Sequence, residues 1–255
     1  MEILVCVKRV PTVGGVITLT ADQRAVDTKT SGFTISPHEE CAVEEAVRLV
    51  ERFGGSVTVT SLGPVAAEEQ LRACLALGAT AAVLLETADG TETGPIATAA
   101  ALHTVAASRP FDLVLLGNEA SDTGGYQVGI RLAHLLGRPV GTGIKAISVS
   151  DDGTSLAASR TYRGALETFT LPLPCVLTLK EGINLPRYPS LPGRLRAKRA
   201  PITRIPVGDT LAGGDVLMTR LRVPDAPKQQ ATVLGHGPDA VPALVSVLTE
   251  IGVLS

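Results

Sequence analysis

The sequence FDLVLLGNEASDTGGYQVGIRLAHLLGRPVGTG, residues 111–143, carries the clearest structural signal in this chain. Residues 113–116 are a continuous apolar run that ends at Gly117, which predicts a strand buried on both faces. Apolar side chains then recur at helical spacing over residues 127–136, and Gly137 ends the pattern. A buried strand, a polar loop and a helix in this order are typical of a parallel α/β domain.

The polar loop between that strand and that helix, residues 118–126, has the composition of an anion-binding site. Gly124 and Gly125 would let the backbone approach a bound group, and the next helix would present free N–H groups to it. Asp122 would accept hydrogen bonds from a ribose or from the loop itself. However, neither glycine-rich phosphate-binding fingerprint is present, and any α/β domain uses such residues to turn a corner. A nucleotide site and a plain connecting loop therefore both stay open at this point.

The first 110 residues alternate between strand and helix patterns. Ser36, Pro37 and Glu39 are a strong helix start, as N-cap, first helical residue and partner in a capping box. The pattern predicts, in order, a strand at 3–7, a helix at 37–52, a strand at 56–62, a helix at 66–77, a strand at 81–86 and a helix at 95–108. This alternation predicts a doubly wound, mostly parallel sheet with helices on both faces and the first strand at its centre.

After residue 143 the pattern changes to short alternating strands. Antiparallel strands are expected at 146–149, 156–162 and 167–171, with a hairpin turn at Asp151-Asp152-Gly153. Residues 174–179 form a further buried apolar run. We therefore expect the sheet to end in antiparallel edge strands.

From Lys180 onward the chain is rich in proline and basic residues. Between Arg187 and Arg204 there are six basic residues and no acidic one, and residues 240–252 predict an amphipathic helix. We expect a nucleotide-binding α/β domain over 1–180 and an extended, partner-binding C-terminal arm over 181–255. We expect a tail of this kind to lie on a partner subunit. An RNA-contacting arm would need aromatic stacking platforms, and the basic run contains only Tyr188.

The composition limits the class of protein. The chain has 255 residues, 45% of them hydrophobic but only 3% aromatic, so its core is aliphatic, as between helices and a parallel sheet. A formal net charge of −2 does not suit a protein that neutralises nucleic acid or a membrane surface. Because no apolar run approaches a membrane span and the N-terminus is a strand pattern, we expect a soluble cytoplasmic protein.

The cysteines and histidines do not form a recognisable catalytic or metal site. The histidines are scattered, and no serine or cysteine has a nucleophile motif around it, so we expect no catalytic residues. The cysteines are far apart in apolar settings, which favours buried small hydrophobes over disulfides or metal ligands. These cysteines are Cys6, Cys41, Cys74 and Cys175.

Several motifs resemble the beta, or small, subunit of electron transfer flavoproteins. They are ISPHEECAVEEAVRLVE at 35–51, the loop and helix at 112–139, LPCVLTLKEGINLPRYPSLPGRLRAKRAPI at 173–202, CVKRVP at 6–11, LGP at 62–64 and LALGA at 75–79. The resemblance covers residues 1 to about 205 in order and with family-like spacing. It implies an adenine-nucleotide alpha-hydrolase-like α/β fold.

The resemblance also implies partners and cofactors. The small subunit pairs with a larger alpha subunit that holds most of a redox-active FAD, and it buries a structural AMP in its own domain. The heterodimer carries electrons from acyl-CoA dehydrogenases and similar flavoenzymes to a membrane quinone oxidoreductase or another acceptor. Because the family includes organellar members with weak presequences, the mitochondrial matrix is the alternative to a cytoplasmic location.

The family's AMP-lining positions can be transferred to this chain by motif. The resemblance implies hydrogen bonds from Ser36 and the loop amides to the nucleotide, with Gly124 and Gly125 among the phosphate neighbours. The flavin is expected near the positions of Val13, where a valine departs from the usual aromatic residue, and His38, which could instead be a surface neighbour of the capping box. The AMP-lining positions are Cys6, Ser36, Pro37, His38, Glu39, Leu62, Gly117, Asn118, Glu119, Ala120, Ser121, Asp122, Thr123, Gly124, Gly125, Tyr126, Gln127 and Val128.

The resemblance also implies that a second segment docks on dehydrogenases. Its apolar plug, the side chain that would insert into the partner, is Leu191. Prolines on both sides of the plug are expected to hold the segment extended and lower the entropy lost on docking. The basic run after it would meet an acidic partner surface and steer the encounter. The segment consists of Tyr188, Pro189, Ser190, Leu191, Pro192 and Gly193.

Two other functions are compatible with parts of the sequence. In the electron-bifurcating branch of the family a second FAD replaces AMP and the small subunit oxidises NADH. That branch tends to carry a second acidic residue and a small residue where this chain has Gly124 and Tyr126. An ATP-binding stress or ligase-like domain shares the doubly wound layer, but Asp122 alone is a thin basis for a metal site, and the basic arm has no place there.

Overall fold

The computed structural model describes residues 1–12, 14, 17–91, 93–208, 216, 218–224 and 231–254. The chain divides into two compact units, Met1–Arg220 and Leu221–Ser255. Each unit is described by itself below.

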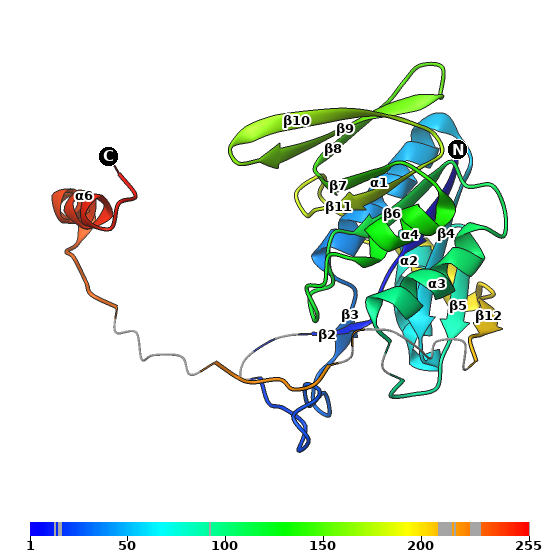
Figure 1. Cartoon of the computed structure of the whole chain (residues 1–255), viewed down its shortest axis with the longest axis horizontal. Helices are drawn as coiled ribbons and strands as arrows, with labels where there is room; N and C mark the ends of the chain where they lie inside the picture. The colour runs from blue at the N-terminus through cyan, green and yellow to red at the C-terminus, as the bar shows by residue number, and fades with distance from the viewer. Residues whose placement is uncertain are drawn as a thin grey trace. The chain divides into compact units, whose positions relative to one another are not determined.

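The first unit is built on a seven-stranded sheet in which every neighbouring pair is parallel (Figure 1). The predicted central position of the first strand is confirmed, since it lies fourth of seven. In spatial order the strands are β12 (Thr203–Pro206), β5 (Ala81–Glu86), β4 (Ser56–Gly63), β1 (Glu2–Cys6), β6 (Leu113–Gly117), β11 (Cys175–Leu179) and β7 (Val140–Ile144).

Helices cover both faces of this sheet, which confirms the doubly wound fold. One face packs against α1 (Pro37–Phe53) and α2 (Glu68–Leu77), the other against α3 (Pro95–Ala106) and α4 (Val128–Leu136). A short 3₁₀ turn, η1 (Val65–Ala67), precedes α2. Successive β1 side chains divide between the two cores, because side chains alternate along a strand: Ile3 and Val5 face α1 and α2, whereas Leu4 and Cys6 face α3 and α4.

The three predicted antiparallel strands are confirmed, but they are not edge strands of the main sheet. They form a separate sheet in the order β10-β9-β8, and β12 and β7 occupy the edges of the main sheet. The chain leaves β7, makes this three-stranded sheet, and returns to insert β11 between β6 and β7. The strands of this second sheet are β8 (Ala146–Val149), β9 (Ser155–Tyr162) and β10 (Ala165–Pro172). A third sheet has only two strands, β2 (Val10–Pro11) and β3 (Phe33–Thr34).

Two elements after Lys180, α5 and β12, pack against the α/β layer. The helix α5 (Leu191–Arg199) contacts α2, and the Arg72 guanidinium donates to the carbonyls of Ala197 (2.8 Å) and Ala200 (3.0 Å) near its end. The expectation of an extended segment over residues 188–193 is therefore wrong from Leu191 onward. The physical reason is a helix-capping signal, because Ser190 Oγ accepts from the Gly193 amide at 3.1 Å.

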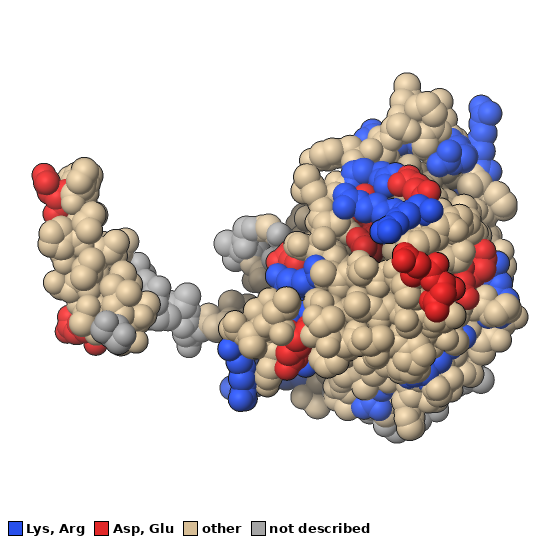
Figure 2. All heavy atoms as spheres, turned by 90° about the horizontal axis from the view of Figure 1, so that it is seen from above, with Lys and Arg blue, Asp and Glu red and all other residues tan. Residues whose placement is uncertain are grey.

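The second unit contains a 3₁₀ turn, η3 (Gly237–Ala240), followed by α6 (Val241–Glu250), which confirms the predicted terminal helix. None of the ten residues of α6 is buried. No helix in the described part of the chain is both long enough and apolar enough to cross a membrane. Figure 2 shows basic and acidic side chains interspersed over one face of the molecule, in keeping with a net charge near zero.

Candidate functional site

A pocket lies at the carboxyl end of the central strands, where the direction of chain winding reverses. The chain runs from β1 to β4 and β5 on one side, then crosses through α3 to β6 on the other side of β1. This reversal leaves a crevice between the starts of helices on opposite sides, which is where open α/β sheets bind ligands. The pocket contains about 880 Å³ of space, part of it open to solvent.

Many of the expected nucleotide residues line this pocket. They are Cys6, Glu39, Leu62, Gly117, Asn118, Glu119, Ala120, Thr123, Gly125, Tyr126, Gln127 and Val128. The other expected residues are close to these in the chain but do not line the pocket: Ser36, Pro37, His38, Ser121, Asp122 and Gly124. Val13, an expected flavin neighbour, lies outside the described residues.

The sequence patterns missed one wall of the pocket. This wall is formed by α3 and the residues just before it, namely Thr93, Pro95, Thr98 and Leu102. Four other lining residues were also not predicted: Val7, Lys8, Leu116 and Gly129. The proline at the first position of α3 marks a helix start at the carboxyl edge of the sheet, and that signal could have identified this wall.

The buried carboxylate of Glu39 forms part of the pocket wall. It accepts hydrogen bonds from the backbone amides of Ser36 and Lys8, both at 3.0 Å, so it joins the start of α1 to the end of β1. Burial raises the pKa of Glu39 to about 7, although these hydrogen bonds and the Lys8 charge act in the opposite direction. Glu39 is therefore a buried acid that titrates near neutral pH.

Beside Glu39, the capping box joins Ser36 and Glu39 at the start of α1. The neighbouring His38 Nδ1 is buried without a hydrogen-bond partner among the described residues. Buried polar groups are normally satisfied, by protein, water or ligand. His38 Nδ1 therefore has an unused hydrogen-bonding capacity near the start of α1.

Gly117 allows α1 to approach the end of β6 closely. A Cβ atom at this position would lie 2.8 Å from Glu39 Cγ and 3.2 Å from His38 Cβ. Any side chain at residue 117 would push against the wall formed by Glu39. The glycine is required here for close packing, since its backbone needs no left-handed conformation.

The loop after β6 is held at both ends. At its start, the Asn118 amide donates to the Leu179 carbonyl at 2.8 Å, and Asn118 Oδ1 accepts from Thr178 Oγ1 at 2.8 Å. Further along, both oxygens of Asp122 accept from Lys8 Nζ, at 2.9 and 2.7 Å. The loop is therefore tied by Asp122 to Lys8, which follows β1 and lines the pocket, in a partly exposed ion pair.

Tyr126 lies on the pocket wall in an unusual backbone conformation. Its φ of 56° is in the left-handed region, which few residues other than glycine occupy, and its side chain is 53% exposed. Interaction with Glu119 raises the pKa of its phenol. The ring occupies space at the mouth of the pocket.

The cysteines and the other potential metal ligands show no reactive arrangement among the described residues. Burial, and then the nearby Glu39, raise the pKa of the Cys6 thiol far above its usual value, so this cysteine is neutral. All four cysteines are buried with free thiols, as the sequence predicted for their burial. Within the described ranges, no three His, Cys, Asp or Glu side chains are arranged to hold a metal ion.

The expected docking segment is strongly exposed. The side chains of Tyr188 and Leu191 are 94% and 71% exposed, although both are large and apolar. They lie immediately before and at the start of α5, whose last turn carries Arg196, Lys198 and Arg199.

The chain is similar to known proteins along most of its length. The family model of the electron transfer flavoprotein domain matches residues 24–210. The chain is 36% identical over 220 residues to the electron transfer flavoprotein subunit beta of Bacillus subtilis, covering 84% of this chain and 85% of that protein. The human subunit beta is 35% identical over 255 residues, covering 99% and 98%. That of Bradyrhizobium diazoefficiens is 36% identical over 258 residues and covers 100% of both chains.

Proposed function

The chain belongs to the electron transfer flavoprotein family as a beta subunit, and we propose that it binds a structural AMP and pairs with an alpha subunit that holds most of a FAD. The heterodimer would carry electrons from acyl-CoA dehydrogenases or similar flavoenzymes to a membrane quinone oxidoreductase or another acceptor. The observation that carries this proposal is the pocket at the carboxyl edge of β1 and β6.

The pocket residues fit a mononucleotide. Apolar side chains and a few polar groups line the pocket together, as is usual in small-molecule sites. Next to the pocket, His38 Nδ1 is a buried polar atom without a partner among the described residues. Gly125 leaves open space beside the loop, and Lys8, paired with Asp122, is a cation in the pocket lining. These features support the assignment of the loop after β6 as the phosphate-binding element.

The flavin would supply the electron-carrying chemistry, and this chain would help to position it. His38 is the described residue that we propose for contact with the flavin, since it begins α1 beside the pocket. The large subunit would make most of the flavin contacts. In keeping with an electron carrier, we propose no catalytic residue on this chain.

The C-terminal unit supports the expected heterodimer. The helix α6 is amphipathic but buries none of its residues, and Val241, Leu244 and Val245 are among its exposed apolar side chains. Such a surface needs a cover, because large apolar patches on soluble proteins mark interaction sites. We assign residues 1–180 to nucleotide binding and residues 181–255 to partner binding, with α6 docking on the alpha subunit.

The proposal is tested by the nucleotide content of the complex. The chain is co-expressed with its alpha subunit, the purified heterodimer is denatured, and released FAD and AMP are quantified by chromatography. We expect one FAD and one AMP per heterodimer. Two FAD and no AMP would instead indicate the bifurcating branch and a pocket that accommodates a flavin despite Tyr126. The absence of any adenine nucleotide would remove the proposed site.

A second prediction concerns Leu191. Replacing it with alanine should weaken docking to acyl-CoA dehydrogenases by about tenfold, because an apolar anchor of this size contributes on the order of 1.5 kcal/mol when buried. The KM of the dehydrogenase for the heterodimer measures this effect, and FAD and AMP content should not change. Leu166→Ala is the matched control, since Leu166 is similarly exposed, at 75%, on β10. An unchanged KM with every dehydrogenase tried would exclude Leu191 as the anchor.

A further inference from the structure

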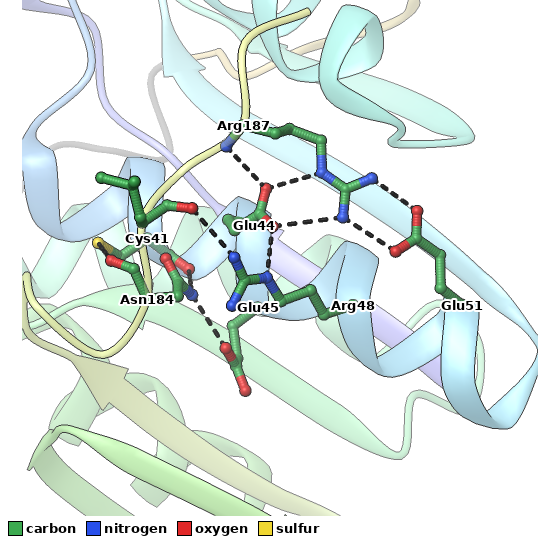
Figure 3. Close-up of polar contacts among 8 residues, drawn as sticks. Cys41, Glu44, Glu45, Arg48, Glu51, Asn184 and Arg187 are labelled. Carbon is green, nitrogen blue, oxygen red and sulfur yellow. Dashed lines mark hydrogen bonds and ion pairs between the residues drawn. The ribbon is translucent and has the colours of Figure 1, made fainter.

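The segment that leads into the docking surface is tied to the middle of α1 by charged side chains. Figure 3 shows Arg187 lying between two carboxylates of this helix, Glu44 and Glu51, with Arg48 on the other side of Glu44. We call Glu44, Arg48, Glu51 and Arg187 the α1 clamp. The clamp joins positions more than 130 residues apart in the chain.

Arg187 is held through both its side chain and its backbone. Its Nε donates to Glu44 at 2.9 Å, while its two terminal nitrogens donate to the two oxygens of Glu51 at 2.6 and 2.9 Å. Its backbone amide donates to Glu44 at 3.1 Å. A bidentate contact between a guanidinium and a carboxylate fixes the relative orientation of the two groups as well as the distance between them. Together these bonds fix the course of the chain immediately before Tyr188.

The residues just before Arg187 are also attached to α1. Asn184 Nδ2 donates to the Cys41 carbonyl at 3.0 Å and to Glu45 at 2.9 Å. The Arg48 guanidinium donates to the Leu185 carbonyl at 3.0 Å. Residues 184, 185 and 187 are therefore each bonded to α1, and the helix acts as a rigid support for the segment.

The ion pairs of the clamp add little to the stability of the fold, because burying the Glu44 carboxylate costs hydration free energy. The Glu44 side chain is 2% exposed, so ionising it requires the loss of its hydration. Burial opposes the charge, but hydrogen bonds from Arg187 and Arg48 keep the pKa of Glu44 below its usual value. Apolar residues in place of a buried ion pair often stabilise a protein as well or better. What the charged arrangement adds is a defined geometry.

That geometry holds apolar side chains in solvent. Leu185, Tyr188 and Leu191 are 83%, 94% and 71% exposed, on both sides of the clamped Arg187. Flexible loops lose conformational entropy when they bind, and a segment fixed beforehand loses less. The positive side chains at the end of α5 lie next in the chain.

We propose that Arg187 is a positioning residue, and that the α1 clamp presents Leu185, Tyr188 and Leu191 as one docking surface for a flavin dehydrogenase. The partner site that fits this surface is an apolar socket with an acidic rim, which would meet the basic end of α5. The inference rests on the proposed function, because it names residues that prepare the docking segment for its partner.

The test measures docking and chemistry separately in the complete heterodimer. With an acyl-CoA dehydrogenase of the same organism, Arg187→Ala should raise the KM for the heterodimer about tenfold and leave kcat within about twofold. Arg187→Lys should recover only part of this loss, because lysine keeps the charge but lacks the planar fork. Glu51→Gln should raise KM by about threefold, and it leaves Glu44 paired with Arg187 and Arg48, so folding is preserved.

Arg109→Ala is the control, since Arg109 forms an ion pair with Glu2 at 3.5 Å and takes no part in the α1 clamp. Its KM should equal that of the wild type. If Leu191→Ala weakens docking while Arg187→Ala and Glu51→Gln leave KM unchanged, the clamp has no positioning role and the docking assignment stands. If Leu191→Ala is also without effect, the docking assignment itself fails. Equal KM values for Arg187→Lys and the wild type would show that charge alone suffices and would overturn the positioning role.

Discussion

A Gly117→Ala variant should lose most of its bound AMP and unfold more readily than the wild type. The added Cβ would lie 2.8 Å from Glu39 Cγ, so the Glu39 side chain would have to move. Its hydrogen bonds from the amides of Ser36 and Lys8 would then weaken, leaving buried N–H groups without a partner. Overpacking of this kind typically costs about 1–3 kcal/mol. Thermal unfolding of the heterodimer and its AMP content measure the two effects.

Gly125→Ala separates these effects, because Gly125 lines the same pocket but a Cβ there would meet no atom within 4 Å. We expect this variant to unfold like the wild type. If the phosphate lies against the loop, as proposed, Gly125→Ala should still release AMP more readily. Unchanged stability and AMP content in Gly117→Ala would mean that α1 is free to shift and that the Glu39 wall is unimportant.

The stability of the protein should fall as the pH rises from about 5 to 8, and Glu39 should account for much of the change. The pKa of Glu39 is raised from 4.5 to about 7 by burial. Between these values the unfolded chain has lost the proton and the folded chain retains it, so folding is favoured most below about pH 4.5. That contribution disappears as the pH rises through about 7. The full difference corresponds to on the order of 3 kcal/mol.

Glu39→Gln should flatten this pH dependence, because glutamine does not ionise. Unfolding temperatures of the two heterodimers are compared at pH 5, 6, 7 and 8, and the gap between them should widen at high pH in favour of the variant. Glu51→Gln is the control on the same helix. Hydrogen bonds from Arg187 lower the pKa of Glu51, so it stays ionised over this range and its removal should leave the slope unchanged. Parallel curves for Glu39→Gln and the wild type would contradict the assignment.

Local sequence patterns predicted most of the strands and helices in the first 180 residues. Apolar runs predicted β1, β5, β6 and β11, since strands buried on both faces are mostly apolar. The Ser36-Pro37 start of α1 was equally clear, because capping depends on residues next to one another in the chain. The pocket loop followed from the strand before it and the helix after it.

Elements formed mainly by distant contacts were missed. The edge strand β12 reads TRIP and is exposed along its length, and β7 contains two glycines, so neither has a strand pattern of its own. Both exist because a neighbouring strand supplies hydrogen bonds. The short, polar helix α5 depends on α2, whose Arg72 binds the carbonyls near its end.

For the candidate site, the sequence by itself determined that a glycine-rich loop and a capped helix would lie at the carboxyl ends of parallel strands. This followed because the order of strands and helices dictates which ends meet. Only the tertiary structure decided that α3 forms the opposite wall, that Lys8 pairs with Asp122, and that α1 holds Arg187. These arrangements join residues far apart in the chain, and no local pattern encodes the distance between two side chains that meet only after folding.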